Sequence, residues 1–248
     1  MEYKILEYGE ITSTNDIAID LANRGESHGT VVIASSQTKG RGRTGRSFIS
    51  NSTNGLYMSV ILRPSLPCEG YNTLTPLIAV SVVNALEKTT NLVPKIKWVN
   101  DIYINDKKVC GILTEAKLSK SSFEYIVCGI GINLAPPKDG FAPEISQIAG
   151  AVFENEVPKD YKKTLYTEIL NELFAYYDNI EKKSYMQKYR DCSMIIGQEV
   201  DAYFGNEVVS GVAIEICDDG ALVIKCNDGS IRCFNSGEAR IRRAGIAL

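Results

Sequence analysis

A short segment rich in glycine and arginine constrains this chain more than any other part of its sequence. Residues 40–46 read GRGRTGR, and they follow a strand-like run at residues 30–36, TVVIASS. Four of the chain's 27 Lys and Arg residues fall at positions 39–46, although the formal net charge of the chain is −3. Glycine lets backbone N–H groups approach a ligand closely, and arginine adds planar charged groups that suit phosphate and carboxylate. The segment therefore predicts a loop that binds an anion.

The same segment partly matches two well-known phosphate-binding patterns. Its three glycines satisfy GxGxxG, and residues 40–47 nearly satisfy the P-loop pattern, with Arg46 in place of the lysine. Both patterns require a helix directly afterwards. Residues 47–63 instead are rich in Ser and Asn and then become strand-like, without a 3.6-residue apolar period. The dinucleotide-binding fold and the P-loop are therefore excluded, and a solvated, disordered basic loop is the alternative to an anion site.

Length and charge exclude several classes of protein. With 248 residues and 44% hydrophobic content, the chain can form one large core, or a large and a small domain. The negative net charge argues against a general nucleic-acid binder, which needs a broad basic surface. Residues 1–10 lack the apolar centre of a signal peptide, and no apolar run is long enough to cross a bilayer. We therefore expect a cytoplasmic protein that does not bind a membrane.

Cysteine and histidine usage limits the chemistry further. The seven cysteines are an odd number at irregular spacing without a CxxC pair, which argues against disulfides and zinc ligands. Cys110, Cys128, Cys217 and Cys226 lie in apolar strand patterns and are predicted to be buried thiols. The single histidine, His28, excludes histidine-based triads and His-rich metal sites. Any catalysis is expected to use carboxylates, lysine or arginine.

Periodicity predicts an α+β fold for the first part of the chain. Strands are expected at residues 3–8, 30–36, 55–63, 95–99, 101–104, 109–116 and 123–132. Helices are expected at residues 13–24, 71–89 and 157–184, with a further short turn at 184–191. Ser13 and Asp16 have the spacing of a capping box, and Asn105-Asp106 is typical of a tight hairpin turn. The order of the strands indicates an antiparallel or mixed sheet flanked by helices.

The last part of the chain has a different pattern. From Gly197 onward, short strand-like runs alternate with turn residues at 205–206, 218–220 and 227–229. About five strands in such a short stretch suggest a small SH3-like β-barrel. We therefore predict a catalytic domain at residues 1–194 and an SH3-like domain at residues 195–248.

Three further segments carry polar residues at places where a ligand could bind. Ser13-Thr14-Asn15 stands at a predicted helix start, Lys97-Trp98-Val99-Asn100-Asp101 stands between two predicted strands, and Asn133 ends the run VCGIGINL at 127–134. Lys108 follows the predicted hairpin turn. Each segment also has a purely structural explanation: an N-cap, a solvated strand end or a turn cap.

The ordered set of these motifs resembles the biotin protein ligase family. The set is S-T-N, a loop Q-x-x-G-R-G-R-x-G-R beginning at Gln37, K-W-x-N-D, Lys108 before GIL, and G-I-N. The resemblance extends to the carboxyl-terminal segment, through Gly211, Ile216, residues 220–222 and the run GEARIR. It implies a mixed sheet flanked by helices, like that of class II aminoacyl-tRNA synthetases, plus an SH3-like barrel. It further implies the short form that lacks an amino-terminal DNA-binding domain, and hence no role in binding DNA.

The resemblance also implies a two-step reaction. Biotin and ATP would form biotinyl-5′-adenylate and pyrophosphate with Mg²⁺ as cofactor, and a lysine of a biotin carboxyl carrier protein domain would then displace AMP. No metal ligands follow from the motifs. Members of the family occur as monomers and as homodimers.

Matching positions carry the family's roles onto this sequence. The catalytic residues would be Arg43, Lys108 and Asp101, with Asp101 positioning or deprotonating the acceptor lysine. The biotin-binding residues would be Ser13, Thr14, Asn15, Gln37, Gly40, Arg41, Gly42, Lys108 and Gly111. The nucleotide-binding residues would be Arg43, Arg46, Phe48, Asn100 and Asn133. The apolar wall would comprise Trp98, Gly111, Ile112, Leu113 and Gly129.

Two positions depart from the family pattern, and two other functions compete. Val99 stands where the family usually has proline, and Phe48 stands where a larger tryptophan ring is common. A lipoate or octanoate ligase or transferase shares the fold, and Cys110 could serve it as an acyl carrier. A non-catalytic ligand-binding or RNA-binding module could also use the loop, but the negative charge of the chain argues against RNA.

Overall fold

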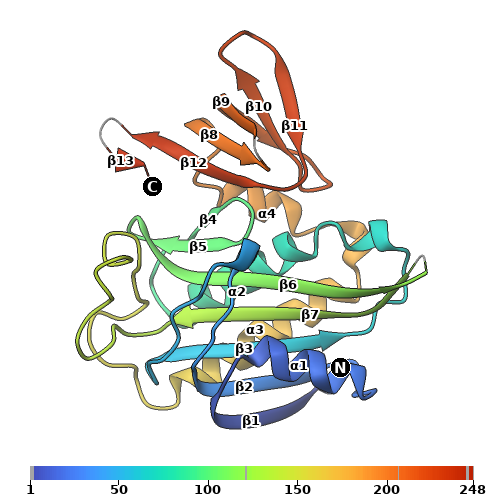
Figure 1. Cartoon of the computed structure of the whole chain (residues 1–248), viewed down its shortest axis with the longest axis vertical. Coiled ribbons are helices and arrows are strands. Elements are labelled where there is room, and N and C mark those ends of the chain that lie inside the picture. The colour runs from blue at the N-terminus through green and yellow to red at the C-terminus, as the bar shows by residue number, and fades with distance from the viewer. Residues whose placement is uncertain (1–2, 121, 206, 244–245, 248) are drawn as a thin grey trace.

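The computed structural model describes residues 3–120, 122–205, 207–243 and 246–247 (Figure 1). Its larger sheet has seven strands in the order β1-β2-β3-β7-β6-β5-β4. These strands are β1 (Lys4–Ile11), β2 (Thr30–Gln37), β3 (Gly55–Leu62), β4 (Lys95–Lys97), β5 (Asp101–Ile104), β6 (Lys107–Ser119) and β7 (Ser122–Asn133). Strands β1 and β2 are parallel, whereas the five other pairs of neighbouring strands are antiparallel. The predicted mixed sheet is therefore confirmed.

Helices cover both faces of this sheet (Figure 1). They are α1 (Thr14–Asn23), α2 (Leu74–Thr89), α3 (Tyr161–Tyr177) and α4 (Met186–Asp191), with single turns at Cys68–Tyr71 and Ile180–Lys182. Helix α2 packs on α3 and on the sheet, and α1 packs on the other face against β3 and β7. The helix predicted from residue 157 begins only at Tyr161 and ends at Tyr177, and the helix predicted from residue 71 begins at Leu74.

Alternation along the central strands divides the sheet into an apolar face and a face that holds the site. Met58 and Val60 of β3, and Cys128 and Ile130 of β7, belong to the main core with α2 and α3. The intervening residues of these strands point to the side of α1, because successive strand side chains face opposite ways. The side of α1 is also apolar at Ile61 and Val127, which pack with α1 in a second cluster, so these strands are hydrophobic along much of their length.

The predicted hairpin turn between β5 and β6 is confirmed. Asn105 and Asp106 both have positive φ, at 49° and 61°, and Ile104 pairs directly with Lys107. Asn and Asp tolerate this left-handed backbone, which the tightest two-residue hairpins need. The turn fixes the register that places Asp101 and Lys108 at one end of the sheet.

The C-terminal part forms a second sheet, which lies beyond the β4–β5 edge of the first (Figure 1). Its six strands have the order β11-β10-β9-β8-β12-β13. They are β8 (Glu199–Phe204), β9 (Glu207–Ile216), β10 (Leu222–Cys226), β11 (Ile231–Phe234), β12 (Glu238–Arg243) and β13 (Ile246–Ala247). The structure thus has one strand more than the sequence suggested, and its order has two edges, so the described strands are not paired as a closed barrel.

Some predictions are corrected or fall outside the described residues. All seven cysteines are free, and Cys110 and Cys128 are buried as predicted, but Cys217 and Cys226 are partly exposed because they lie at strand ends beside turns. Residues 1–2 of the predicted non-signal amino terminus and Asn206 of one predicted turn are outside the described residues. Among the helices that the structure describes, none is long and apolar enough to cross a membrane. The domain boundary at residue 195 stays a prediction.

Candidate active site

A cavity of about 560 Å³ lies between the Gly/Arg loop, the N-terminus of α1, the central strands and the C-terminal sheet. The structure brings most of the predicted site residues together in its wall. These are Ser13, Thr14, Asn15, Gln37, Arg41, Gly42, Arg43, Arg46, Phe48, Asn100, Asp101, Lys108 and Gly111. The predicted apolar residues Trp98, Ile112, Leu113 and Gly129 line it as well.

Glycines at alternate positions of β6 and β7 open the floor of the cavity. Gly111 pairs with Gly131, which pairs on its other side with Tyr57. The ring of Phe48 lies across both glycines, since an added Cβ would come within 2.7 Å of this ring at Gly131 and 3.3 Å at Gly111. Strand alternation therefore explains the run VCGIGINL: its apolar side chains enter the core, Gly131 leaves room for Phe48, and Gly129 leaves room for Asn15.

The side chain of Asn15 lies over Gly129 of β7. Its Oδ1 accepts a hydrogen bond from Ser59 Oγ at 2.6 Å, and its Nδ2 donates to Glu115 Oε2 at 2.8 Å and to the Leu113 carbonyl at 3.4 Å. An added Cβ at Gly129 would lie 2.1 Å from Asn15 Oδ1. Only glycine at this position leaves Asn15 in place.

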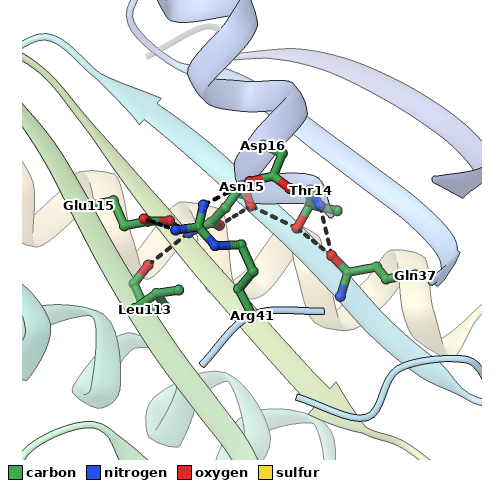
Figure 2. A network of polar contacts seen from close by, with 8 residues as sticks. Thr14, Asn15, Asp16, Gln37, Arg41, Leu113 and Glu115 are labelled. Carbon is green, nitrogen blue, oxygen red and sulfur yellow. Dashed lines mark hydrogen bonds and ion pairs between the residues drawn. The ribbon is translucent and has the colours of Figure 1, made fainter. Parts of the chain in front are cut away.

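The start of α1 is held by a side chain from the sheet (Figure 2). The Thr14 N–H and its hydroxyl both donate to Gln37 Oε1, at 2.7 and 3.1 Å, and Gln37 Nε2 donates to Ser50 Oγ at 3.0 Å. The Ser13 side chain makes no capping hydrogen bond, so the capping box predicted for Ser13 and Asp16 is wrong. Ser13 lines the cavity, and Gln37 of β2 accepts the N–H of Thr14, the first residue of the helix.

The Gly/Arg loop folds as a narrow hairpin. Its base is closed by hydrogen bonds from Phe48 N to the Gly40 carbonyl at 2.9 Å and from Gly42 N to the Arg46 carbonyl at 2.7 Å. At its tip, Thr44 and Gly45 have φ of 52° and 76°. A left-handed backbone at two consecutive residues turns the chain sharply, which aims the flanking arginines away from the loop.

Each of the three loop arginines has partners within the protein. Arg41 donates to Asp16 of α1 at 2.7 Å and to Glu115 of β6 at 2.6 Å (Figure 2). Burial of the guanidinium acts to lower the Arg41 pKa, but the hydrogen bonds and charges of Asp16 and Glu115 together outweigh it and raise the pKa. The Arg41 side chain thus anchors the loop on the catalytic sheet.

The other two arginines connect the loop to the C-terminal sheet. Arg43 donates to Asn100 Oδ1 at 2.9 Å and to the Gly237 carbonyl at 2.8 Å, and Arg46 forms an ion pair with Glu238 at 2.5 Å. The hydrogen bond with Glu238 raises the Arg46 pKa. Two cations from the loop therefore meet the C-terminal part at one end of the cavity.

Two further groups of opposite charge stand at the same end. Lys108 Nζ lies 2.7 Å from Asp101 Oδ1, and both side chains are about one quarter exposed, at 28% and 22%. Asn100 beside them donates from Nδ2 to the Ile112 carbonyl at 2.8 Å, which fixes its amide. The pairing of β5 with β6 thus brings Asp101 of the K-W-x-N-D motif close to Lys108.

Lys97 is a cavity residue to which the sequence assigned no role. It is only 7% exposed, and its Nζ lies 5.7 Å from the centre of the Tyr103 ring. Burial lowers the Lys97 pKa, and the charges of Asp101 and Glu238 oppose this shift. The position of Lys97 in K-W-x-N-D was the available signal.

Residues of the C-terminal sheet also line the cavity, which sequence reasoning did not foresee. They are Tyr203, Gly205, Ser236, Gly237 and Glu238. The sheet is fixed against the larger one by Trp98, whose Nε1 donates to the Gly220 carbonyl at 3.0 Å. The only sequence signal was the run GEARIR, which includes Gly237 and Glu238.

Two predicted residues lie outside the wall of this cavity. Gly40 packs behind the loop, where an added Cβ would lie 2.2 Å from Ser50 Oγ, so its role there is close backbone approach. Asn133 donates from Nδ2 to the Gly150 carbonyl at 3.0 Å and lines a second cavity of about 370 Å³ beside residues 135–143.

The structure also bears on Cys110 and on potential metal ligands. The Cys110 side chain is fully buried, and burial raises the pKa of its thiol far above the usual range, which argues against an acyl-carrier role. In the part of the chain that the structure describes, no cluster of three or more His, Cys, Asp or Glu side chains could hold a metal ion.

Two family models match the chain. The model of the biotin/lipoate A/B protein ligase family matches residues 8–133, and the model of the biotin protein ligase C-terminal domain matches residues 195–242. The first match spans the loop and the motifs of the cavity, and the second spans the sheet that closes it.

Known relatives and structures agree with these matches. The chain is 32% identical to the bifunctional ligase/repressor BirA of Bacillus subtilis over 239 residues, which cover 95% of this chain and 74% of the relative. It is 28% identical to the biotin–[acetyl-CoA-carboxylase] ligase of Paracoccus denitrificans over 219 residues, which cover 86% of this chain and 90% of the relative. The biotin protein ligase of Aquifex aeolicus in complex with biotin and ATP superposes with a TM-score of 0.80 at 29% identity, over 97% of this chain and 99% of the other. The chain therefore belongs to the biotin/lipoate A/B protein ligase family and carries the C-terminal domain of the biotin protein ligases.

Proposed function

We propose that this chain is an ATP-dependent biotin protein ligase. It would form biotinyl-5′-adenylate from biotin and ATP, and then transfer biotin to a lysine of a biotin carboxyl carrier protein domain. The observation that carries the proposal is the order of groups along the cavity. A polar pocket, a floor of glycines under Phe48 and a pair of opposite charges follow one another along β6.

This order fits the order of groups in biotin. The side chains of Thr14, Asn15 and Gln37 offer hydrogen bonds to a polar ring such as the ureido group. Gly111 and Phe48 give an apolar stretch for the rings and chain, and Lys108 stands beyond it. From Leu113 to Lys108 the strand advances about 16 Å, at about 3.3 Å per residue. A molecule with a polar head, an apolar body and a terminal carboxylate can therefore bind lengthwise, with its carboxylate at Lys108.

The first step joins two anions, so the site must offset their repulsion. A carboxylate oxygen of biotin attacks the α-phosphorus of ATP, an O–P bond forms, and the bond to the leaving pyrophosphate breaks. Lys108 and Arg43 supply positive charge at this end, and Arg46 would hold the loop or the pyrophosphate. Charges of this kind act more strongly in a site that excludes water than in solution.

The ion pair of Lys108 with Asp101 links the two steps, because Lys108 would act in the first step and Asp101 in the second. Without substrate, the two charges neutralise each other across 2.7 Å. A bound carboxylate or phosphate offers Lys108 a second anion, which would leave Asp101 available to the incoming acceptor amine. In the second step the acceptor amine attacks the acyl carbon, a C–N bond forms, the C–O bond to AMP breaks, and the amine proton passes to Asp101.

The nucleotide and its metal would occupy the end of the cavity beside the C-terminal sheet. Asn100 and Phe48 line this cavity, whereas Asn133 would read the adenine from the neighbouring one. Mg²⁺ bound with ATP would neutralise part of the triphosphate charge. Asp101 and Glu238 are carboxylates of the wall and fit such an ion, because Mg²⁺ in nucleotide sites commonly uses one or two carboxylates together with phosphates.

The decisive test is biotin-dependent exchange of labelled pyrophosphate into ATP by the purified chain, with lipoate as the competing substrate. Exchange with biotin and not with lipoate supports the proposal, whereas exchange with lipoate alone assigns the chain to the other branch of the family. A second assay measures the intact mass of a carrier domain after incubation, with an acceptor Lys→Arg carrier as control. We further propose that the protein acts in the cytoplasm, where ATP is available. Light scattering would distinguish a monomer from a homodimer.

A further inference from the structure

The side chain of Arg41 is held by two carboxylates that do not line the cavity. Asp16 belongs to the first turn of α1 and Glu115 to β6, and each accepts a hydrogen bond from a different nitrogen of the guanidinium (Figure 2). The Arg41 and Asp16 side chains are 42% and 43% exposed, and Glu115 is 23% exposed. One residue of the loop thus joins two elements that are distant in sequence.

This contact is continuous with the polar pocket. The second oxygen of Glu115 accepts a hydrogen bond from Asn15 Nδ2 at 2.8 Å, and Asn15 in turn accepts one from Ser59 at 2.6 Å. The position of the loop and the orientation of Asn15 therefore depend on the same carboxylate. A loop that lifts from the sheet removes a charge from Glu115 and loosens the pocket below it.

The hairpin shape of the loop transmits this anchor to its tip. Arg41 pairs with Ser47 across the base, and the backbone bonds at Gly42 and Phe48 lie on either side of that pair. If Arg41 leaves its two carboxylates, the base of the loop is no longer attached to α1 and β6. The loop is then held by the contacts of Arg43 and Arg46 with Asn100, Gly237 and Glu238. Those contacts lie at the end where the phosphates must enter, so they compete with substrate.

We propose that Asp16 and Glu115 are positioning residues that hold the Gly/Arg loop closed through Arg41, and so set how long the adenylate intermediate stays bound. This proposal rests on the proposed function. Because the guanidinium of Arg41 is directed to these carboxylates, its part in the reaction is to keep the loop in place. The intermediate is hydrolysable, and a closed loop shields it from water until the acceptor arrives.

The matched variants are Asp16→Asn and Asp20→Asn. Asp20 lies one turn further along α1 and pairs with Arg24 at 3.3 Å, at 67% and 76% exposure, without contact to the loop. Both changes remove one negative charge from the same helix. Asp16→Glu restores the charge and serves as the rescue variant, and Glu115→Gln tests the second carboxylate.

The first measurement needs no substrate. Hydrogen exchange of the Gly42 and Phe48 amides in the ligand-free protein reports opening of the loop. We expect about fivefold faster exchange in Asp16→Asn, the upper end for a partly exposed ion pair, with no change in Asp20→Asn and recovery in Asp16→Glu. Equal exchange in Asp16→Asn and wild type would overturn the anchor.

The second measurement separates retention from chemistry. Biotinyl-adenylate should leave Asp16→Asn about fivefold faster, while the single-turnover rate of its formation stays within twofold of wild type. Faster loop exchange with unchanged release would overturn the role in retention. Failure of the wild-type chain to make the adenylate would instead reject the proposed function, and the exchange result on the loop would stand independently of it.

Discussion

Lys108 and Asp101 form an ion pair at the reactive end of the cavity, with 2.7 Å between Nζ and Oδ1. In the register set by the Asn105-Asp106 turn, Asp101 pairs with Gly111 and Lys108 with Tyr103, so the two side chains meet diagonally across β5 and β6. Each is therefore placed to act on substrate and also to restrain the other. This relationship leads to the first prediction.

Lys108→Ala should slow formation of biotinyl-adenylate by about 100-fold, because one preorganised charge at the reacting centre is lost. Single-turnover formation of the adenylate measures the effect. Lys107→Ala is the control on the same strand, since Lys107 Nζ donates to the Gln147 carbonyl, away from the cavity. If Lys108→Ala forms the adenylate at a rate within twofold of wild type, Lys108 has no role in the first step.

Arg43→Gly should release the adenylate prematurely, because a cation of the cavity wall that would face the adenylate phosphate is lost. We expect the release rate to rise at least tenfold, since a charged side chain in a partly buried network contributes about 1.5–3 kcal/mol. The measurement is the yield of free adenylate after gel filtration. Thr44→Gly is the control: it adds the same backbone freedom at a residue whose φ is already 52°. Equal yields in the two variants would point to loop flexibility alone.

Gly129→Ala should weaken biotin binding more than it destabilises the sheet. The new Cβ would lie 2.1 Å from Asn15 Oδ1, so Asn15 must leave its hydrogen bonds with Ser59 and Glu115. Gly9→Ala on β1 is the matched control, because no atom lies within 4 Å of a Cβ at Gly9. Calorimetric titration with biotin should show a loss of affinity of at least about fivefold for Gly129→Ala, given the cost of about 1–3 kcal/mol for displaced polar groups. Unchanged affinity would exclude Asn15 from the pocket.

The stability of the fold should depend on His28 below neutral pH. Burial lowers the His28 pKa from its ordinary value of 6.5, and the charge of Arg63 adds to this, whereas Asp178 opposes it. The Arg63 N–H also donates to His28 Nδ1 at 3.0 Å, and this bond needs the neutral ring. The unfolded chain therefore binds the proton more readily, so the contribution of His28 is complete above about pH 6.5 and is lost as the pH falls through the lowered folded pKa.

Urea unfolding of wild type and His28→Gln between pH 5 and pH 8 measures this effect. The free energy of unfolding should rise with pH more steeply in wild type than in the variant. Because the chain has one histidine, its ring proton resonances give the folded pKa directly. Parallel pH profiles for the two proteins would contradict the prediction.

Local patterns in the sequence determined a large part of this protein. The strand-like patterns at residues 55–63 and 123–132 predicted β3 and β7, and the turn at Asn105-Asp106 fixed the register of β5 and β6. The Gly/Arg loop, the S-T-N segment and K-W-x-N-D identified most of the cavity wall. Such features depend on neighbours within a few residues, so their physical causes are present in the sequence itself.

Only the tertiary structure decided the partners of these residues. Arg46 meets Glu238 across 192 positions of sequence, and Arg41 meets Glu115 across 74. Ser13 does not cap α1, whose Thr14 N–H is bound by Gln37 of β2, and Asn133 lies at a neighbouring cavity. Strand order and the packing of the second sheet determine which distant groups come within hydrogen-bond reach. A charge in the sequence therefore shows that a partner is needed, and only the folded chain shows which partner is near enough to bind it.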